Sequence, residues 1–143
     1  MLPKWHILFG ILFSVLVYLM FNITIIQAIV IFSASVFIDL DHYIFAVKRN
    51  KIFSLKTIYN WHKNLPKNHK PIMHIFHTLE FLILIFFLSF YFKEFLFILI
   101  GMLFHSILDI IDMIYNNKLA CREFSFFRYI ISDKRKYLRI IFL

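Results

Sequence analysis

The sequence predicts an all-α, polytopic membrane protein with four transmembrane helices, and composition and apolar run length carry this prediction. Hydrophobic residues make up 62% of the 143 residues, with a mean hydropathy of +0.78, whereas only about half of a soluble domain is apolar. Four apolar stretches are long enough to cross a hydrocarbon core of about 30 Å at about 1.5 Å per helical residue. With two glycines and three prolines, the chain has no linker composition, so we expect one domain over residues 1–143.

The charged residues between the apolar stretches predict how the spans are oriented. The predicted spans cover residues 5–21, 23–40, 75–92 and 94–115. The links within the first pair and within the second pair are minimal, whereas residues 43–73 form a long basic loop and residues 118–143 a basic tail. By the positive-inside rule, the loop and both termini lie in the cytoplasm. We therefore expect a multi-pass protein of the inner or plasma membrane.

The net charge of +8 is assigned to the membrane surface. Basic residues beside apolar spans contact anionic headgroups, so we expect membrane lipids as partners and no nucleic acid. Ile52, Leu55 and Tyr59 form an apolar stripe at helical spacing, and the tail alternates aromatic residues with cations. Because the charged run Asp133–Lys136 would be costly in lipid, both segments are predicted to be interfacial amphipathic helices.

Ionisable residues in the spans gather at the predicted cytoplasmic ends. Burial of such groups in lipid costs several kcal/mol, which makes them functional candidates. His105 and Asp109 lie one helical turn apart and share a face, as do Asp39 and His42. The candidate metal ligands are His6, Asp39, Asp41, His42, His69, His74, His77, His105 and Asp109.

This donor set indicates a divalent metal. Imidazole and carboxylate bind zinc, manganese and non-haem iron, and a cation offsets the desolvation of the carboxylates. We predict zinc, with manganese or iron as alternatives, in a site of one or two metals. Asp39 and Asp41 are the candidate catalytic residues, because a carboxylate outside the coordination sphere can act as general base on a water molecule.

Four sequence features carry a family resemblance. They are an early His6, an Asp-x-Asp-His run at residues 39–42, histidines that open the third span, and Gly-x-x-x-His-x-x-x-Asp at residues 101–109. Over about residues 5–115, this pattern resembles the membrane-bound metal-dependent hydrolase family, which includes LexA-regulated inner-membrane hydrolases and archaeal relatives. The resemblance implies metal roles for His6, Asp39, Asp41, His42, His105 and Asp109.

The third-span motif departs from the family pattern. The family commonly shows His-Arg-Gly followed by Thr-His-Ser, whereas this chain has His69-Lys70-Pro71 followed by Met73-His74-Ile75, with His77-Thr78 as a competing register. The sequence leaves open which of the three histidines is used.

Three functions fit the pattern. A hydrolase would polarise an ester or phosphoryl oxygen of a lipid or phosphoester at the cytoplasmic face. A metal or proton transporter would need polar residues across the full membrane depth, and the far halves of the spans are apolar apart from small residues such as Ser14 and Ser33. A non-catalytic protein would hold the metal as a structural element in a closed site. Substrate and oligomeric state, an oligomer included, stay open.

Structural roles are alternatives for three carboxylates. Asp39 can cap a helix or pair with Lys48, Glu80 can pair with His77 inside the membrane, and Asp112 can pair with an arginine of the tail.

Overall fold

The computed structural model describes residues 3–51, 53–64, 66 and 72–132. In this part the chain is mostly helical, as predicted, and a short parallel strand pair is the exception. The elements are α1 (Pro3–Met20), α2 (Ile25–Phe37), α3 (Leu40–Asn50), α4 (Leu55–Lys63), β1 (Ile72–Met73), the 3-10 turn η1 (Ile75–His77), α5 (Leu79–Ser89), α6 (Lys93–Tyr115), the 3-10 turn η2 (Leu119–Cys121) and β2 (Arg122–Glu123). Residues 126–132 are helical as well.

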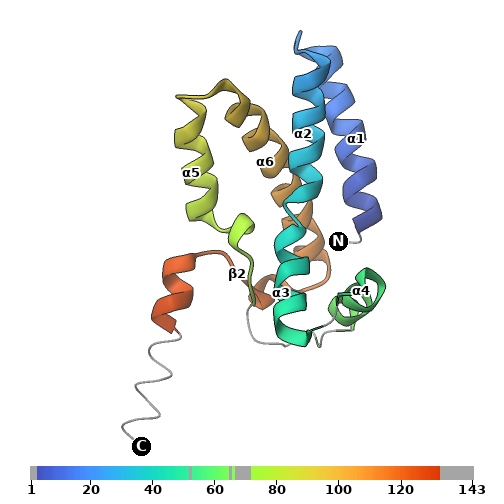
Figure 1. Cartoon of the computed structure of the whole chain (residues 1–143), viewed down its shortest axis with the longest axis vertical. Helices are drawn as coiled ribbons and strands as arrows, with labels where there is room; N and C mark the ends of the chain where they lie inside the picture. The colour runs from blue at the N-terminus through green and yellow to red at the C-terminus, as the bar shows by residue number, and fades with distance from the viewer. Residues whose placement is uncertain (1–2, 52, 65, 67–71, 133–143) are drawn as a thin grey trace, which may run out of the picture.

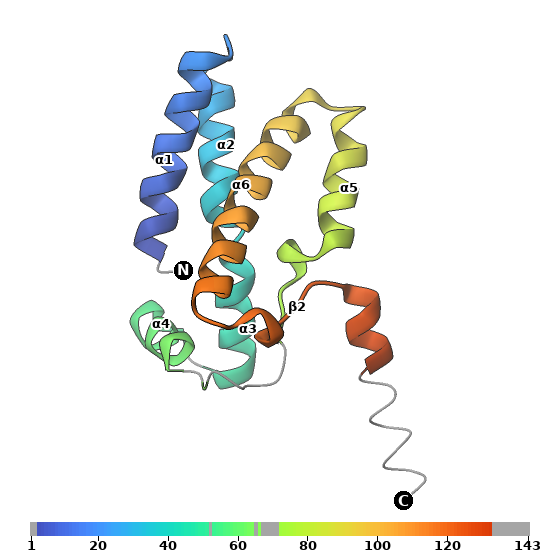
Figure 2. The same ribbon diagram turned by 180° about the vertical axis from the view of Figure 1, so that it is seen from behind.

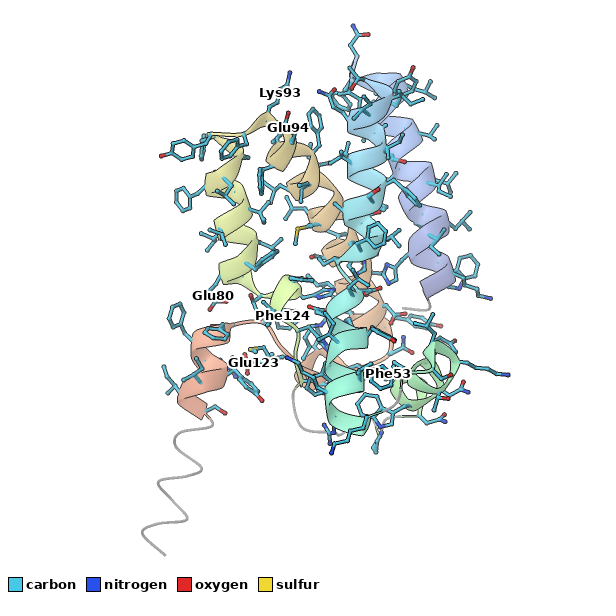
Figure 3. All side chains as sticks on the ribbon, in the orientation of Figure 1. Phe53, Glu80, Lys93, Glu94, Glu123 and Phe124 are labelled. Carbon is cyan, nitrogen blue, oxygen red and sulfur yellow. The ribbon has the colours of Figure 1, made fainter. Side chains whose placement is uncertain are left out.

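The long helices run alternately up and down. α2 packs against both α1 and α6, and α5 packs against α6. Figures 1 and 2 show that the start of α1, all of α3 and α4, and β2 lie at one end of the bundle. Lys93 and Glu94, labelled in Figure 3, lie at the opposite end. The ends of the helices that carry the candidate residues are therefore gathered at one end.

Two threonines set where helices begin. Thr24 caps α2: its side chain accepts a hydrogen bond from the Gln27 N–H at 3.3 Å, and the Gln27 side chain accepts one from the Thr24 N–H at 2.8 Å. Thr78 caps α5 by accepting from the Phe81 N–H at 3.3 Å. Because residues 75–77 form a 3-10 turn and Thr78 is extended, α5 has 11 residues and is shorter than the predicted span 75–92.

Among the described residues, two helices are long and apolar enough to cross a membrane, Ile25–Arg49 and Lys93–Tyr115, judged by length and composition. α1 and α5 are also apolar but shorter. The first of the two long helices runs through the α2–α3 turn, so the helical rod continues past residue 40, where the second predicted span ends.

The segments predicted as interfacial contain helices where they are described. The segment 43–73 holds the remainder of α3 and then α4, although Ile52 lies outside the described residues. The tail contains β2 and the helical residues 126–132, and residues 133–143 lie outside the described part. The pairing of Ile72 with Arg122 and of Met73 with Glu123 in β1–β2 was not predicted from the sequence.

The two glycines of the chain bring α1 and α6 close to α2. At Gly101, a Cβ atom would clash with the backbone carbonyl oxygen of Ile31. At Gly10, a Cβ atom would lie 2.6 Å from the Ser35 hydroxyl oxygen. Small residues at such contacts let membrane helices approach closely. Each glycine stands one helical turn from a histidine of the site described below.

We expect Gly101→Ala to lower the stability of the bundle and Gly10→Ala to leave it nearly unchanged. Alanine favours a helix by about 1 kcal/mol over glycine, but at residue 101 it must displace a backbone, and overpacking of this kind costs about 1–3 kcal/mol. At residue 10 the obstacle is a side-chain hydroxyl that can rotate away. Thermal unfolding of both variants in the same detergent checks this, and equal melting temperatures for the two would contradict the close packing at Gly101.

Candidate metal centre

The interior at this end of the bundle is polar. Most of the buried side chains there carry imidazole, carboxylate or hydroxyl groups. Across the described residues, the buried polar and charged residues are His6, Ser14, Ser35, Asp41, His74, His77, Thr78, His105 and Asp109. The apolar core is small and lies beside them, around Ile38, Ile85, Leu99 and Met102. Burial of this many ionisable groups is costly unless they pair with one another or bind a cation.

The turn between α2 and α3 separates two neighbouring carboxylates. Residues 38 and 39 interrupt the helix, and α3 restarts at Leu40. As a result, Asp39 points toward α6 while Asp41 reaches η1, where its Oδ2 accepts the Phe76 N–H at 2.9 Å. Asp39 makes no side-chain capping hydrogen bond, so its alternative role as a helix cap is not observed.

Four donor atoms from three parts of the chain converge at the centre. Asp39, His77, His105 and Asp109 each offer one atom, all within 4.8 Å of one another. His105 Nε2 lies 3.4 Å from Asp39 Oδ1 and 3.5 Å from Asp109 Oδ2. His77 Nε2 lies 3.6 Å and 3.7 Å from the same two oxygens, and 3.2 Å from His105 Nε2.

The Nδ1 atoms of the His77 and His105 rings each contact a hydrogen-bond acceptor. His105 Nδ1 lies 2.7 Å from the backbone carbonyl oxygen of Ser35, and because a carbonyl only accepts, Nδ1 carries the proton. His77 Nδ1 lies 3.1 Å from the Asp41 carboxylate and donates to it in the same way. In the neutral rings the two Nε2 lone pairs therefore face each other, an arrangement that requires a proton or a metal ion between them.

The spacing of the donors matches a metal coordination shell. Bonds of about 2.0–2.2 Å to a tetrahedral ion put neighbouring ligand atoms roughly 3.3–3.6 Å apart. Of the six distances among the four donors, the five that involve a histidine nitrogen run from 3.2 to 3.7 Å, and the two carboxylate oxygens lie within 4.8 Å of each other. The contacts of His77 with Asp41 and of His105 with Ser35 are of the kind that orients histidines at metal sites. This buried group could hold a metal ion.

A second group lies next to the first. Asp41, His42 and His74 also offer donor atoms within 4.8 Å of one another. The His42 and His74 rings are stacked with centroids 3.6 Å apart, and His74 Nδ1 lies 3.7 Å from Asp41 Oδ1. Asp41 Oδ1 is buried and has no hydrogen-bond partner among the described residues. The Asp41 carboxylate thus joins the two groups, because its other oxygen contacts His77.

Asp109 is contacted from two further directions. His6 Nε2 lies 3.2 Å from Asp109 Oδ1, and the His6 ring is stacked on His105 with centroids 4.1 Å apart. Arg122 donates from one terminal nitrogen to Asp109 Oδ2 at 2.8 Å, and its other terminal nitrogen lies 3.0 Å from His42 Nε2. His6 therefore packs beside the four-donor group rather than within it.

The structure gathers the sequence-predicted residues that it describes. Eight of the nine contribute to the two groups or stack against them, and His69 lies outside the described residues. His74 and His77 each offer a donor, one in each group, so both competing registers place a histidine at a group that could hold a metal.

Arg122 and Ser35 were not among the predicted residues. A backbone acceptor such as the Ser35 carbonyl leaves no mark in the sequence. Arg122 stands in a basic tail whose composition indicates headgroup contacts, so only the β1–β2 pairing reveals its position.

Glu80 ties the tail to α5 rather than pairing with His77. Its carboxylate accepts from the Ser125 hydroxyl at 2.6 Å and from the backbone N–H groups of Phe126 and Phe127 at 3.1 and 3.4 Å. Figure 3 shows Glu80 close to Phe124, whose carbonyl accepts the Leu79 N–H at 2.9 Å. These bonds fix the segment that follows Arg122.

Comparison with known proteins finds no relative of this chain. No family model, curated protein or solved structure matches the chain. The resemblance to the membrane-bound metal-dependent hydrolases therefore stays a prediction from the motifs.

We expect Glu80→Ala to loosen residues 122–132 while α6 stays unchanged. The variant removes the carboxylate that accepts hydrogen bonds from Ser125, Phe126 and Phe127, so amide exchange in this segment should accelerate. Hydrogen–deuterium exchange with mass spectrometry measures this, with Glu94→Ala at the other end of the bundle as the control. Unchanged exchange over 122–132 in Glu80→Ala would show that the carboxylate does not hold the tail.

Proposed function

We propose that the chain is a membrane-embedded, metal-dependent hydrolase whose site lies at the cytoplasmic face of four membrane-spanning helices. The observation that carries the metal is the pair of Nε2 atoms of His77 and His105, 3.2 Å apart, with carboxylates of Asp39 and Asp109 around them. Zinc fits this nitrogen and oxygen donor set and its spacing, and manganese and iron use the same donors.

The distribution of polarity supports a position in the membrane. A soluble protein buries its apolar side chains, whereas here large apolar residues cover the outside of the long helices. Exposed examples on the four helices are Leu12, Leu19, Ile26, Ile29, Leu84, Phe87, Ile107 and Ile111. An apolar surface of this extent marks a membrane or protein contact, and the buried ionisable groups follow the pattern of membrane interiors.

The lengths of the helices allow a multi-pass arrangement. α1, with 18 residues, is about 27 Å long at 1.5 Å per residue. α5 is shorter and is preceded by η1, in which His77 is buried and Ile75 is exposed. The basic residues of α3 and α4 lie at the end of the bundle that holds the start of α1, so the positive-inside rule puts this end in the cytoplasm.

An opening at Asp39 favours an enzyme over a structural metal site. The Asp39 side chain is 30% exposed, whereas those of His77, His105 and Asp109 are 7% exposed or less. Catalytic metals need a position open to water or substrate, and structural metals are fully enclosed. Substrate therefore approaches past Asp39, from the cytoplasmic face of the bilayer.

The residues divide the chemistry among them. A bound divalent cation supplies Lewis-acid activation of water and of the ester oxygen. His77, His105 and Asp109 would hold the cation, which leaves the fourth donor, Asp39, outside the coordination sphere at the opening. There its carboxylate would accept a proton as water attacks the ester carbon or phosphorus, and return it to the departing alcohol oxygen when the ester bond breaks. Asp41 holds the His77 ring through Nδ1, which makes it a positioning residue rather than a base. A membrane-resident ester, carboxyl or phosphoryl, is the substrate class that this location favours.

The wild type purified in mild detergent should retain about one metal ion per four-donor group and hydrolyse nitrophenyl esters only when loaded. Elemental analysis of the His105→Ala, Asp109→Ala double variant should show background metal, because it removes half of the donors. Asp39→Asn should keep metal but lose about 10²–10⁴-fold in turnover, the usual size of a general-base effect.

Glu94→Gln, a carboxylate change at the far end of α6, is the matched control and should behave as wild type. Failure to retain metal after reconstitution with zinc, manganese or iron would refute the metal site. Retained metal with no turnover of carboxyl or phosphoryl esters, and a stability loss on chelation, would instead establish a structural metal.

A further inference from the structure

We infer that Arg122 is a substrate-binding residue that holds a phosphoryl oxygen beside the metal group, so that the substrate is a phosphoester. This inference rests on the proposed hydrolase function and specifies the substrate class that the site selects.

The Arg122 side chain is held in a fixed, largely buried position. Its side chain is 9% exposed, and its backbone is fixed by the pairing of β2 with β1. The segment after it is held by the Glu80 carboxylate. Burial of a guanidinium is costly unless its donors are satisfied. A buried arginine at this position therefore indicates a functional role for its positive charge.

The guanidinium lies between the two metal-capable groups. One terminal nitrogen contacts Asp109 of the first group and the other contacts His42 of the second, at 2.8 and 3.0 Å. Within the described part of the chain, these contacts use two of its five N–H donors, and a phosphoryl oxygen would accept from the others. A phosphoryl group held at a cation in either group thus has the arginine within reach.

The same position lies beside the opening of the site. Asp39 and His42 are the more exposed members of the two groups, with side chains 30% and 27% exposed. His42 Nε2 lies 3.6 Å from Asp39 Oδ1 and also contacts Arg122. A substrate that passes Asp39 therefore meets the guanidinium before it is enclosed.

Charge and shape favour phosphate over a carboxyl ester. A neutral ester gains little from a buried cation, whereas a phosphoryl group offers two or more anionic oxygens that match the planar fork of arginine. The Asp109 carboxylate already lies between the guanidinium and the other donors of the first group, and a phosphoryl oxygen would join it there as a second anion. The same recognition applies to a phospholipid headgroup and to a free phosphate compound.

Arg122→Gln and Arg122→Lys in zinc-loaded protein test the inference through phosphate affinity, measured calorimetrically in detergent. We expect Arg122→Gln to keep its metal and to bind inorganic phosphate about 10–100-fold more weakly, the size of a lost charged hydrogen bond. Arg122→Lys should fall between, because lysine supplies charge without the fork. Arg128→Gln, at an arginine side chain that is 79% exposed, is the control and should match wild type.

A second set of ligands identifies the source of the phosphate. Phosphatidic acid in mixed micelles that binds more tightly than glycerol phosphate indicates a lipid headgroup, and the reverse order indicates a soluble phosphoester. Both results depend on Arg122 if the inference holds.

Two outcomes overturn the inference while the proposed function stands. One is unchanged phosphate affinity in Arg122→Gln with metal retained. The other is loss of metal in both Arg122 variants, which makes the arginine a structural partner of Asp109. Absence of metal from the wild type defeats the proposed function itself and is separately visible by elemental analysis.

Discussion

The facing Nε2 atoms of His77 and His105 require a positive charge between them, and the rest of the structure depends on this condition. Both rings are fixed from behind, one by the Asp41 carboxylate and one by the Ser35 carbonyl. Their lone pairs therefore converge at 3.2 Å, and a positive charge must stand between them. To meet this condition, the chain brings α1, the α2–α3 turn, η1, α6 and β2 to one point.

Close helix packing and buried polarity support each other. The glycine at residue 101 lets α6 approach the backbone of α2, which brings His105 within hydrogen-bond distance of the Ser35 carbonyl. Many large apolar side chains lie instead on the outside of the helices. Burial of apolar side chains inside such a bundle contributes little to its stability. The stability depends instead on tight helix contacts and on hydrogen bonding of the polar groups at one end.

The sequence predicts the helices and the gathering of polar residues better than it predicts their pairing. Long apolar runs indicate helices by length alone, and ionisable residues at their ends indicate a site because lipid penalises them. The turn at Ile38 and Asp39 contains neither glycine nor proline, and Asp39 is the one residue in it of a type that favours turns. Arg122 is hidden, since its role arises from a two-residue strand pair that brings together parts of the chain 50 residues apart.

X-ray absorption spectroscopy of the zinc-loaded wild-type protein tests whether the facing histidines bind a metal. We expect a coordination shell of nitrogen and oxygen only, at about 2.0–2.2 Å, with the outer-shell scattering of two imidazole rings. A spectrum with a sulfur ligand, or with a shell of water oxygens and no imidazole scattering, would show that zinc binds elsewhere and that the facing histidines share a proton instead.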